Sequence, residues 1–139
     1  MIQTMIRTYS ELMRFNDYLD RFNYLKLGGK VGASTFGSHR YLNQLLYGSE
    51  EWKRLRDLII VRDYGNDLGV DGRPISGRIV IHHMNPITID DVRDRSEYVL
   101  DPEYLISVSV NTHKAIHYGD ENLLDLPFVE RTANDTKLW

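Results

Sequence analysis

The sequence predicts a single α+β domain in which N-terminal helices precede a strand–strand–helix unit. Three observations favour this fold class. Apolar residues recur at helical spacings of three and four in residues 10–62, two short β-branched runs follow in residues 77–110, and a short helical segment comes after them. With 139 residues the chain fits one domain, 1–139. A domain of this size buries roughly 68% of its unfolded surface, enough for a core of its own.

The composition narrows the possible chemistry. The chain has no cysteine, which excludes disulfides, thiolate catalysis and cysteine-ligated zinc, so any metal must bind histidine or oxygen ligands. No segment approaches the roughly 20 apolar residues that span a bilayer. We therefore expect a soluble, cytoplasmic protein without a membrane partner.

Charge is unevenly distributed along the chain. The net charge is −3, but residues 1–62 carry 10 Lys or Arg and 6 Asp or Glu, whereas residues 63–139 carry 7 and 14. The N-terminal part is thus +4 and the remainder −7. A basic face on the N-terminal helices would suit a phosphate backbone, although an ordinary solvated mixture of charges explains the count equally well.

Residues 8–65 form the predicted helical part. A first helix starts at Ser10 and ends at glycines 28–29, with an apolar face of Leu12, Phe15, Leu19 and Phe22. A second starts at Ser38 and ends before Gly48, with an apolar face of Tyr41, Leu42, Leu45 and Leu46. A third runs from Ser49 to near Gly65, with Trp52, Leu55 and Ile59 inward and Lys53, Arg54 and Arg56 outward or flanking. These apolar stripes are typical of core packing.

Residues 66–119 are predicted to form the strand–strand–helix unit. A turn signal at residues 71–72 precedes a first strand over 77–83, which the sequence Met84-Asn85-Pro86 ends. An acidic connector with one helical turn follows, and its carboxylates are expected to be solvated. Residues 104–110 alternate as a second strand, and a short helix over 111–119 closes at Gly119. Residues 120–139 are expected to pack as an extended arm.

Four of the five histidines lie in this unit. His82 and His83 end the first strand, and His113 and His117 are four apart on the predicted helix. Residues four apart share one face of a helix and can bind one ion, whereas neighbours on a strand point to opposite faces. The fifth, His39, is predicted to be structural or on the surface.

This spacing divides the four histidines into two roles. His82, His113 and His117 would provide three imidazole ligands for one divalent ion and leave a fourth position open, which is typical of a catalytic site. His83 would then be free to act as a general base, since an imidazole titrates near neutral pH. The ion would polarise a phosphate while His83 activates the attacking water. Taken separately, each histidine pair is a weak signal.

At these residues the sequence resembles the HNH endonuclease superfamily, whose ββα-metal motif, the His-Me finger, also occurs in the colicin DNases. The segment HHMNPI is similar to the first strand and turn of that motif, and THKAIHYG is similar to its metal-binding helix. The resemblance implies a metal-dependent DNA endonuclease or nickase with His83 as general base and His82, His113 and His117 as ligands. One divalent ion is expected, namely zinc, nickel, manganese or magnesium.

From about Tyr9 onward the chain also resembles small HNH-type proteins of tailed phages. That resemblance suggests double-stranded DNA as substrate, a role in DNA packaging with a phage terminase as partner, and the host cytoplasm as location. Four basic residues are predicted to contact phosphates: Lys53, Arg56, Arg78 and Lys114. The oligomeric state is not readable from the sequence.

One position departs from the family motif. Counting back from His113 without gaps, the asparagine that braces the base-bearing loop corresponds to Tyr104, and either Asn85 or Asn111 could brace the loop instead. This departure favours one alternative, a non-catalytic phage DNA-packaging or DNA-binding protein with a structural metal site. A plain DNA-binding regulator is a further alternative, favoured only by the basic N-terminal half.

Overall fold

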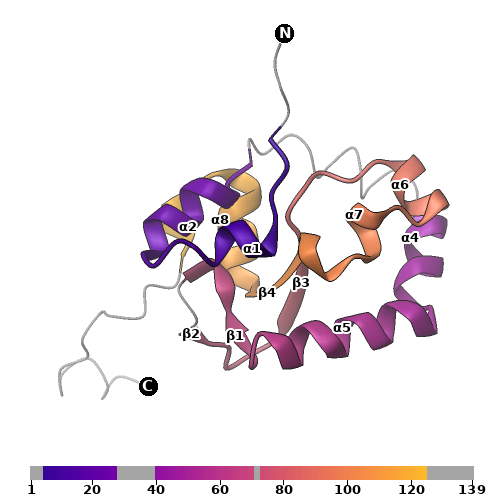
Figure 1. Cartoon of the computed structure of the whole chain (residues 1–139), viewed down its shortest axis with the longest axis horizontal. Coiled ribbons are helices and arrows are strands. Elements are labelled where there is room, and N and C mark those ends of the chain that lie inside the picture. The colour runs from indigo at the N-terminus through magenta and orange to yellow at the C-terminus, as the bar shows by residue number, and fades with distance from the viewer. Residues whose placement is uncertain (1–4, 28–39, 71–72, 125–139) are drawn as a thin grey trace, which may run out of the picture.

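In the computed structural model, which describes residues 5–27, 40–70 and 73–124, helices surround two small antiparallel sheets (Figure 1). The chain is therefore α+β, as the sequence predicts. The helices are α1 (Tyr9–Leu12), α2 (Tyr18–Leu25), α4 (Arg40–Tyr47), α5 (Glu50–Arg62), α6 (Ile89–Asp94), α7 (Glu97–Leu100) and α8 (Val110–Tyr118). The strands are β1 (Asn66–Asp67), β2 (Arg73–Pro74), β3 (Ile79–His83) and β4 (Leu105–Ser109).

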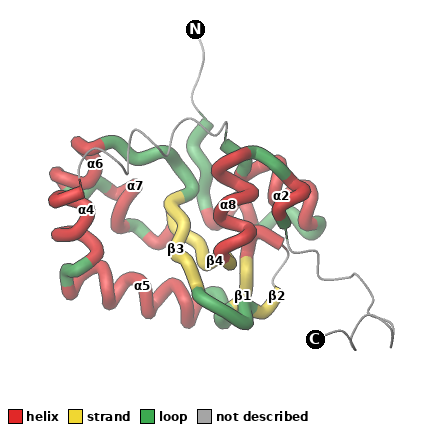
Figure 2. Tube along the Cα trace, turned by 180° about the vertical axis from the view of Figure 1, so that it is seen from behind, coloured by secondary structure: helices red, strands yellow, loops and turns green. Residues whose placement is uncertain are grey.

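The β3–β4 pair lies at the centre of the molecule. The strands pair antiparallel from Ile79 opposite Ser109 to His83 opposite Leu105. Helices α1, α2 and α8 lie on one side of the pair, and α4 to α7 lie on the other (Figures 1 and 2). Ile106 packs in the cluster that includes α8, whereas Leu105 packs against α5. Because both faces are covered, the first four residues of β4 are all buried, and the alternation predicted for this strand is not seen in its burial.

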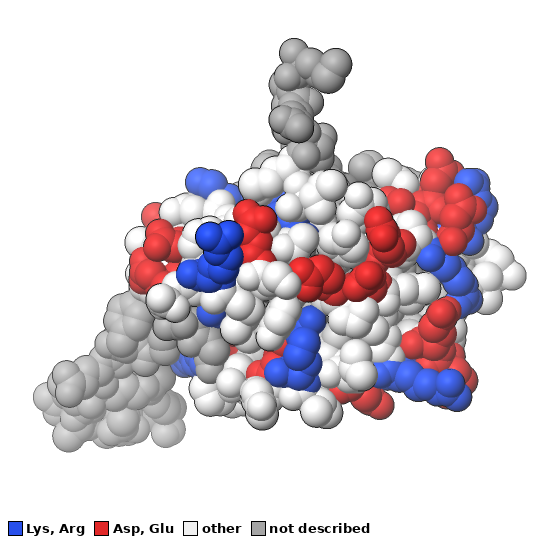
Figure 3. Space-filling view, in the orientation of Figure 1, with Lys and Arg blue, Asp and Glu red and all other residues white. Residues whose placement is uncertain are grey.

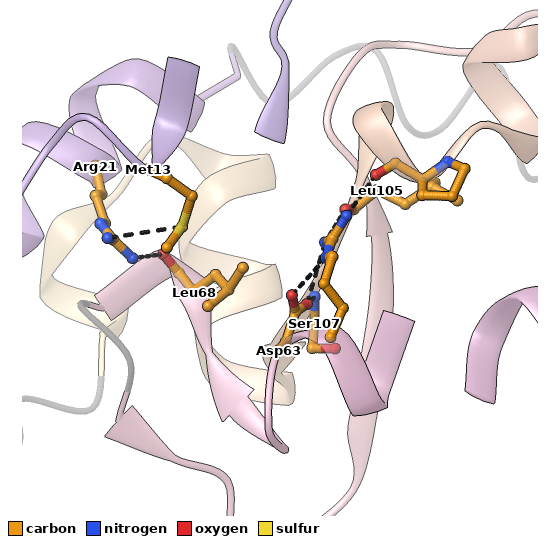
Figure 4. A network of polar contacts seen from close by, with 8 residues as sticks. Met13, Arg21, Asp63, Leu68, Leu105 and Ser107 are labelled. Atoms are coloured by element: carbon orange, nitrogen blue, oxygen red, sulfur yellow. Dashed lines mark hydrogen bonds and ion pairs between the residues drawn. The ribbon is translucent and has the colours of Figure 1, made fainter. Parts of the chain in front are cut away.

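Side chains satisfy the outer edge of β4. The carboxylate of Asp63 accepts a 2.8 Å hydrogen bond from the Ser107 backbone N–H, and Arg62 donates at 2.7 Å each to the carbonyls of Pro102 and Leu105 (Figure 4). Nearby, Arg21 donates to the Leu68 carbonyl at 3.0 Å (Figure 4). An unpaired strand edge would otherwise expose free backbone donors and acceptors. The edge of β4 is therefore paired within the chain.

A second buried carboxylate fixes the start of α8. Asp67 is 3% exposed and accepts hydrogen bonds from the backbone N–H of Gly69 at 2.9 Å, that of Ser109 at 3.1 Å and the Thr112 hydroxyl at 2.6 Å. Ser109 also caps α8 by accepting from the Thr112 N–H. Strand β1 is thereby joined to the first turn of the helix that carries His113 and His117.

We expect Asp67→Asn to lower the free energy of unfolding by about 2–4 kcal/mol, because the new amide N–H₂ group would face buried donors. Urea denaturation at pH 7 measures this change. Asp57→Asn is the matched control, since the Asp57 side chain is 78% exposed. Equal stability of the two variants would contradict the role assigned to Asp67.

The helix predicted from Ser10 is divided in two. Thr8, not Ser10, caps α1, and its hydroxyl accepts from the Glu11 N–H. The chain then leaves the helical conformation, and Asp17, in an extended conformation, precedes α2. Asparagine and aspartate have low helix propensity, which fits a break at Asn16-Asp17 inside an apolar pattern, although the Asp17 side chain makes no cap hydrogen bond to α2.

Two further predictions differ from the structure. On α4, Leu42 and Leu46 face the core while Tyr41 and Leu45 are 71% and 51% exposed, because the α4 face that meets α6 and α7 is centred on Leu46. The acidic connector forms two helices rather than one turn. A capping box between Thr88 and Asp91 starts α6. Acidic side chains gather over α6, α7 and the segment before β4, as predicted for a solvated connector (Figure 3).

The predicted unit over 66–119 corresponds to β1 through α8. Strand β3, strand β4 and helix α8 lie within the predicted ranges or one residue beyond them, and β1 and β2 flank the turn predicted at 71–72. Several predictions lie outside the described residues: the glycine stop at 28–29, the start at Ser38, His39, the turn itself and the arm beyond residue 124. Within residues 5–27, 40–70 and 73–124, no helix combines the length and apolar character needed to cross a membrane.

Candidate metal centre

Three histidines from β3 and α8 converge on one point. His82 lies on β3, and His113 and His117 lie one turn apart on α8. One ring nitrogen from each lies within 4.8 Å of the others, and the Nε2 atoms of His113 and His117 are 3.0 Å apart. Nitrogens bound to one ion at about 2.1 Å in a tetrahedron are roughly 3.4 Å apart. The three side chains therefore lie close enough to bind one metal ion.

Both ends of α8 are held in place. Its first turn is joined to Asp67, as described above. At its last turn the Leu27 backbone N–H donates to the Ile116 carbonyl at 2.8 Å. Gly119 ends the helix in the left-handed region at φ 66°, and a β-carbon there would lie 2.7 Å from the Leu27 carbonyl oxygen. Glycine is therefore required at this position, and the spacing of the two α8 histidines relative to β3 is fixed.

The burial of His82 fits a metal ligand. Its side chain is 1% exposed, and neither ring nitrogen has a hydrogen-bond partner among the described residues. Burial, followed by the neighbouring His113 and His117, holds its pKa well below the ordinary value. A neutral imidazole is the form that binds metal, and two buried nitrogens without partners are costly unless a ligand satisfies one of them. The residues present therefore fit a bound divalent ion.

His83 points to the opposite face of the sheet. Its ring stacks on the indole of Trp52 with centroids 5.5 Å apart and an interplanar angle of 17°. Burial lowers the pKa of His83 to about 4, partly offset by a hydrogen bond to the Val99 backbone. Its Nε2 atom is buried without a hydrogen-bond partner. His83 is therefore neutral at pH 7, and its Nε2 atom, in a buried position, is unpaired among the residues that the structure describes.

One cavity joins the three histidines to His83. Its volume is about 340 Å³, and all five residues of β3 line it. Arg56 of α5 and Arg78, just before β3, also line it, and none of the described lining residues carries a carboxylate. The cavity therefore combines three imidazoles placed closely enough to hold a metal ion, a neutral imidazole and two cations, which suits an anionic ligand.

The other predicted phosphate contacts lie elsewhere. Lys53 and Lys114 are exposed and do not line the described part of this cavity. Asn111 is exposed at the start of α8, where it lines a second hollow together with Arg73 and Arg78. The structure thus brings two of the four predicted basic residues to the histidines, and it places Asn111 away from the loop that follows His83.

Asn85 and Tyr104, the other two positions predicted to brace the loop after His83, both lie at that loop. Asn85 is buried and pairs with the main chain of Arg7, accepting from its N–H at 2.6 Å and donating to its carbonyl at 2.9 Å. The Tyr104 carbonyl accepts from the Met84 N–H at 3.0 Å, while its ring contacts Tyr98 at 4.9 Å between centroids. Asn85 and the Tyr104 main chain therefore hold the loop, and the Tyr104 side chain does not reach the histidines.

Trp52 and Tyr47 are site residues that the sequence did not identify. Trp52 is predicted correctly as an inward residue of α5, but periodicity does not reveal that its partner is His83. Tyr47 contacts Trp52 edge-on at 5.0 Å between centroids, and burial raises its pKa to about 12. The sequence signal for a role of Trp52 in the site was its position one helical turn before Arg56. Only the tertiary structure shows that His83 is its stacking partner.

The chain matches no protein-family model, no curated protein and no solved structure at a significant level. Function is therefore inferred from the geometry of the described residues, together with the resemblance of the histidine segments.

The depressed histidine pKa values predict an acid-sensitive metal-free protein. Burial lowers the pKa of His83 and of His113 to about 4 from 6.5, so the unfolded chain binds more protons than the folded one between these values. The contribution of these histidines to the free energy of unfolding is fully present above pH 6.5, and it decreases as the pH drops toward 4. The slope approaches about 1.4 kcal/mol per pH unit for each such histidine.

Urea denaturation of the metal-free protein at pH 4.5, 5.5 and 7 measures this slope. The matched variant is His113→Leu, which removes one titrating group while other acidic and basic groups remain. We expect a shallower slope for this variant. Identical slopes would show that His113 does not titrate with a depressed pKa.

Proposed function

We propose that the protein is a metal-dependent DNA endonuclease or nickase of the HNH type that hydrolyses phosphodiester bonds. In this proposal β3, β4 and α8 form the ββα-metal module. The observation that carries it is the shared cavity: three ring nitrogens that can bind one ion, the neutral His83, and the two cations Arg56 and Arg78 all line it. This set of groups matches the needs of phosphodiester hydrolysis better than those of a purely structural metal site.

Each group has a defined task in the proposed reaction. A divalent ion bound at the three histidines would polarise the phosphate and stabilise charge on the leaving oxygen. Arg56 and Arg78 would hold the phosphate in the cavity. His83 would take a proton from the attacking water through Nε2, which is buried in the free protein and would have to become accessible when DNA binds. A pKa of about 4 makes His83 a weak base in the free protein, but a phosphate anion placed beside it raises that pKa toward neutrality.

The chemistry of the ligands indicates which metals are favoured, and the resemblance to phage HNH-type proteins suggests the partners. A set of three imidazoles favours zinc, nickel or manganese over magnesium, which prefers oxygen ligands. Double-stranded DNA is the proposed substrate, and a phage terminase is the partner that the resemblance suggests.

The test is nicking of supercoiled plasmid with Zn²⁺, Ni²⁺, Mn²⁺ or Mg²⁺ in turn. We expect relaxed circles with at least one ion, none with excess chelator, and none with His113→Ala. Metal binding without cleavage under every ion, with the packaging partner added as well, would exclude the enzyme.

The alternative is a non-catalytic DNA-packaging or DNA-binding protein in which the same three histidines hold a stabilising ion. Two observations favour this alternative. His83 is only 7% exposed, which limits its access to a water molecule. Tyr104 occupies the position of the asparagine in the family motif. DNA retention and metal-dependent stability without nicking would support this alternative.

We expect loss of the cavity arginines and loss of the exposed lysines to affect DNA binding differently. For duplex DNA, the slope of log affinity against log salt falls by about 0.9 for every phosphate that the protein no longer neutralises. We expect the double variant Arg56→Ala/Arg78→Ala to lower that slope by roughly 2. The matched double variant Lys53→Ala/Lys114→Ala removes the same charge outside the cavity and should leave the slope nearly unchanged. Fluorescence anisotropy with a short duplex, measured over a range of salt, distinguishes the pairs, and equal slopes would contradict binding in the cavity.

A further inference from the structure

We propose that Trp52 is a positioning residue that orients His83 for proton transfer. This inference rests on the proposed function, in which His83 is the base. Trp52 comes from α5, outside the strands and helix that carry the four histidines. It would make the N-terminal helices part of the active site and not only a support for it.

The sheet register brings His83 to Trp52. His83 pairs with Leu105, and cross-strand partners point to the same face, so both side chains meet α5. His82 pairs with Ile106 and meets α8 on the other face. The two adjacent histidines are thus separated by the strand, and α5 provides the contact surface for only one of them.

Two contacts fix the His83 ring. The indole of Trp52 covers one face at 5.5 Å between centroids, nearly parallel at 17°. The hydrogen bond to the Val99 backbone engages the ring edge, and Nε2 is the nitrogen left without a partner. A carbonyl acceptor at Nδ1 keeps the proton there and leaves the Nε2 lone pair free. The stacked indole prevents the ring from turning away from this bond.

Trp52 is itself rigidly held. It is 6% exposed, and its cluster includes Leu55, Ile59 and Leu105. Its backbone N–H is part of the helix cap, donating to the Ser49 hydroxyl at 3.2 Å. Tyr47 closes against it nearly at right angles, at 75°. A side chain fixed on several sides can transmit a defined orientation to the ring that it stacks on.

The test compares Trp52→Leu, which keeps an apolar side chain without a ring, with Trp52→Phe, which keeps a stacking face. We expect Trp52→Leu to lower kcat for nicking by about 10- to 100-fold, with KM and metal affinity within a few-fold of the native values. Trp52→Phe should retain most of kcat. A purely structural role would instead lower the folded fraction and metal affinity together, and equal kcat for the two variants would overturn the proposal.

A second measurement does not depend on activity. In the NMR spectrum of the native protein, the carbon-bound ring protons of His83 should be shifted upfield by the indole ring current, and its ¹⁵N pattern should show a single Nδ1–H tautomer. In Trp52→Leu the upfield shift should disappear. An unshifted His83 ring in the native protein would refute the proposal even if Trp52→Leu does not fold. If the native protein shows the shift but cleaves no DNA, the stacking stands and the proposed function fails.

Discussion

His83→Gln should lower the rate of plasmid nicking by about 10²- to 10⁴-fold, the usual contribution of a general base. The variant keeps a polar side chain of similar length but loses the basic ring nitrogen. His83 lies on the opposite face of the strand from His82, and it lines the same cavity as the three proposed ligands. Metal affinity should therefore stay within a few-fold of the native value. Single-turnover nicking and calorimetric titration with the active ion measure the two quantities.

The separation of these two effects identifies the base. His113→Ala is the contrasting variant, because it should lose metal affinity and nicking together. If His83→Gln nicks at the native rate, His83 is not the base and the proposed division of the histidines is wrong. If it loses metal affinity to the same degree as His113→Ala, His83 acts as a ligand instead.

The strand–strand–helix unit was predictable because its signals are local. A β-branched run ends at His82-His83, and Gly119 ends a helix on which His113 and His117 are four apart, although its cap at Ser109 lies inside the segment predicted as a strand. Periodicity two in the strand and 3.6 in the helix determine which of these residues can share a face. The convergence of His82, His113 and His117 follows from these periods once the two strands pair.

The remaining features depend on contacts between distant segments. In the sequence, nothing distinguishes Asp67 from an ordinary aspartate in a turn. Its role depends on hydrogen bonds from Ser109 and Thr112, which lie more than 40 residues away in the sequence. The stacking of Trp52 on His83 needs α5 to cross the far face of the sheet, which no periodicity encodes. The break before α2 falls at Asn16-Asp17, two residues of low helix propensity inside the apolar pattern of residues 12–22. Sequence patterns therefore predicted the three histidines that converge, whereas the surroundings of His83 required the tertiary structure.

His82→Leu should make the metal-free protein more stable and abolish stabilisation by metal. The native side chain buries two ring nitrogens that have no hydrogen-bond partner in the described part of the chain, and leaving such groups unsatisfied costs about 1–3 kcal/mol. Leucine would fill the site beside Ile106 and Ile116 with apolar atoms only. We therefore expect the free energy of unfolding without metal to rise by about 1–3 kcal/mol. Urea denaturation in chelator at pH 7 measures this gain.

Adding metal should reverse the order of stability. At a free ion concentration about 100 times Kd the native protein gains about 2.7 kcal/mol, whereas a variant that lacks one ligand gains far less. His113→Leu is the matched control: it also removes a ligand, but His113 is only partly buried, so its metal-free gain should be smaller. A His82→Leu variant that is less stable than the native protein in chelator would mean that the buried nitrogens are already satisfied without an ion. A gain without metal that reverses with metal would instead show that His82 is kept at a cost to stability for the sake of binding.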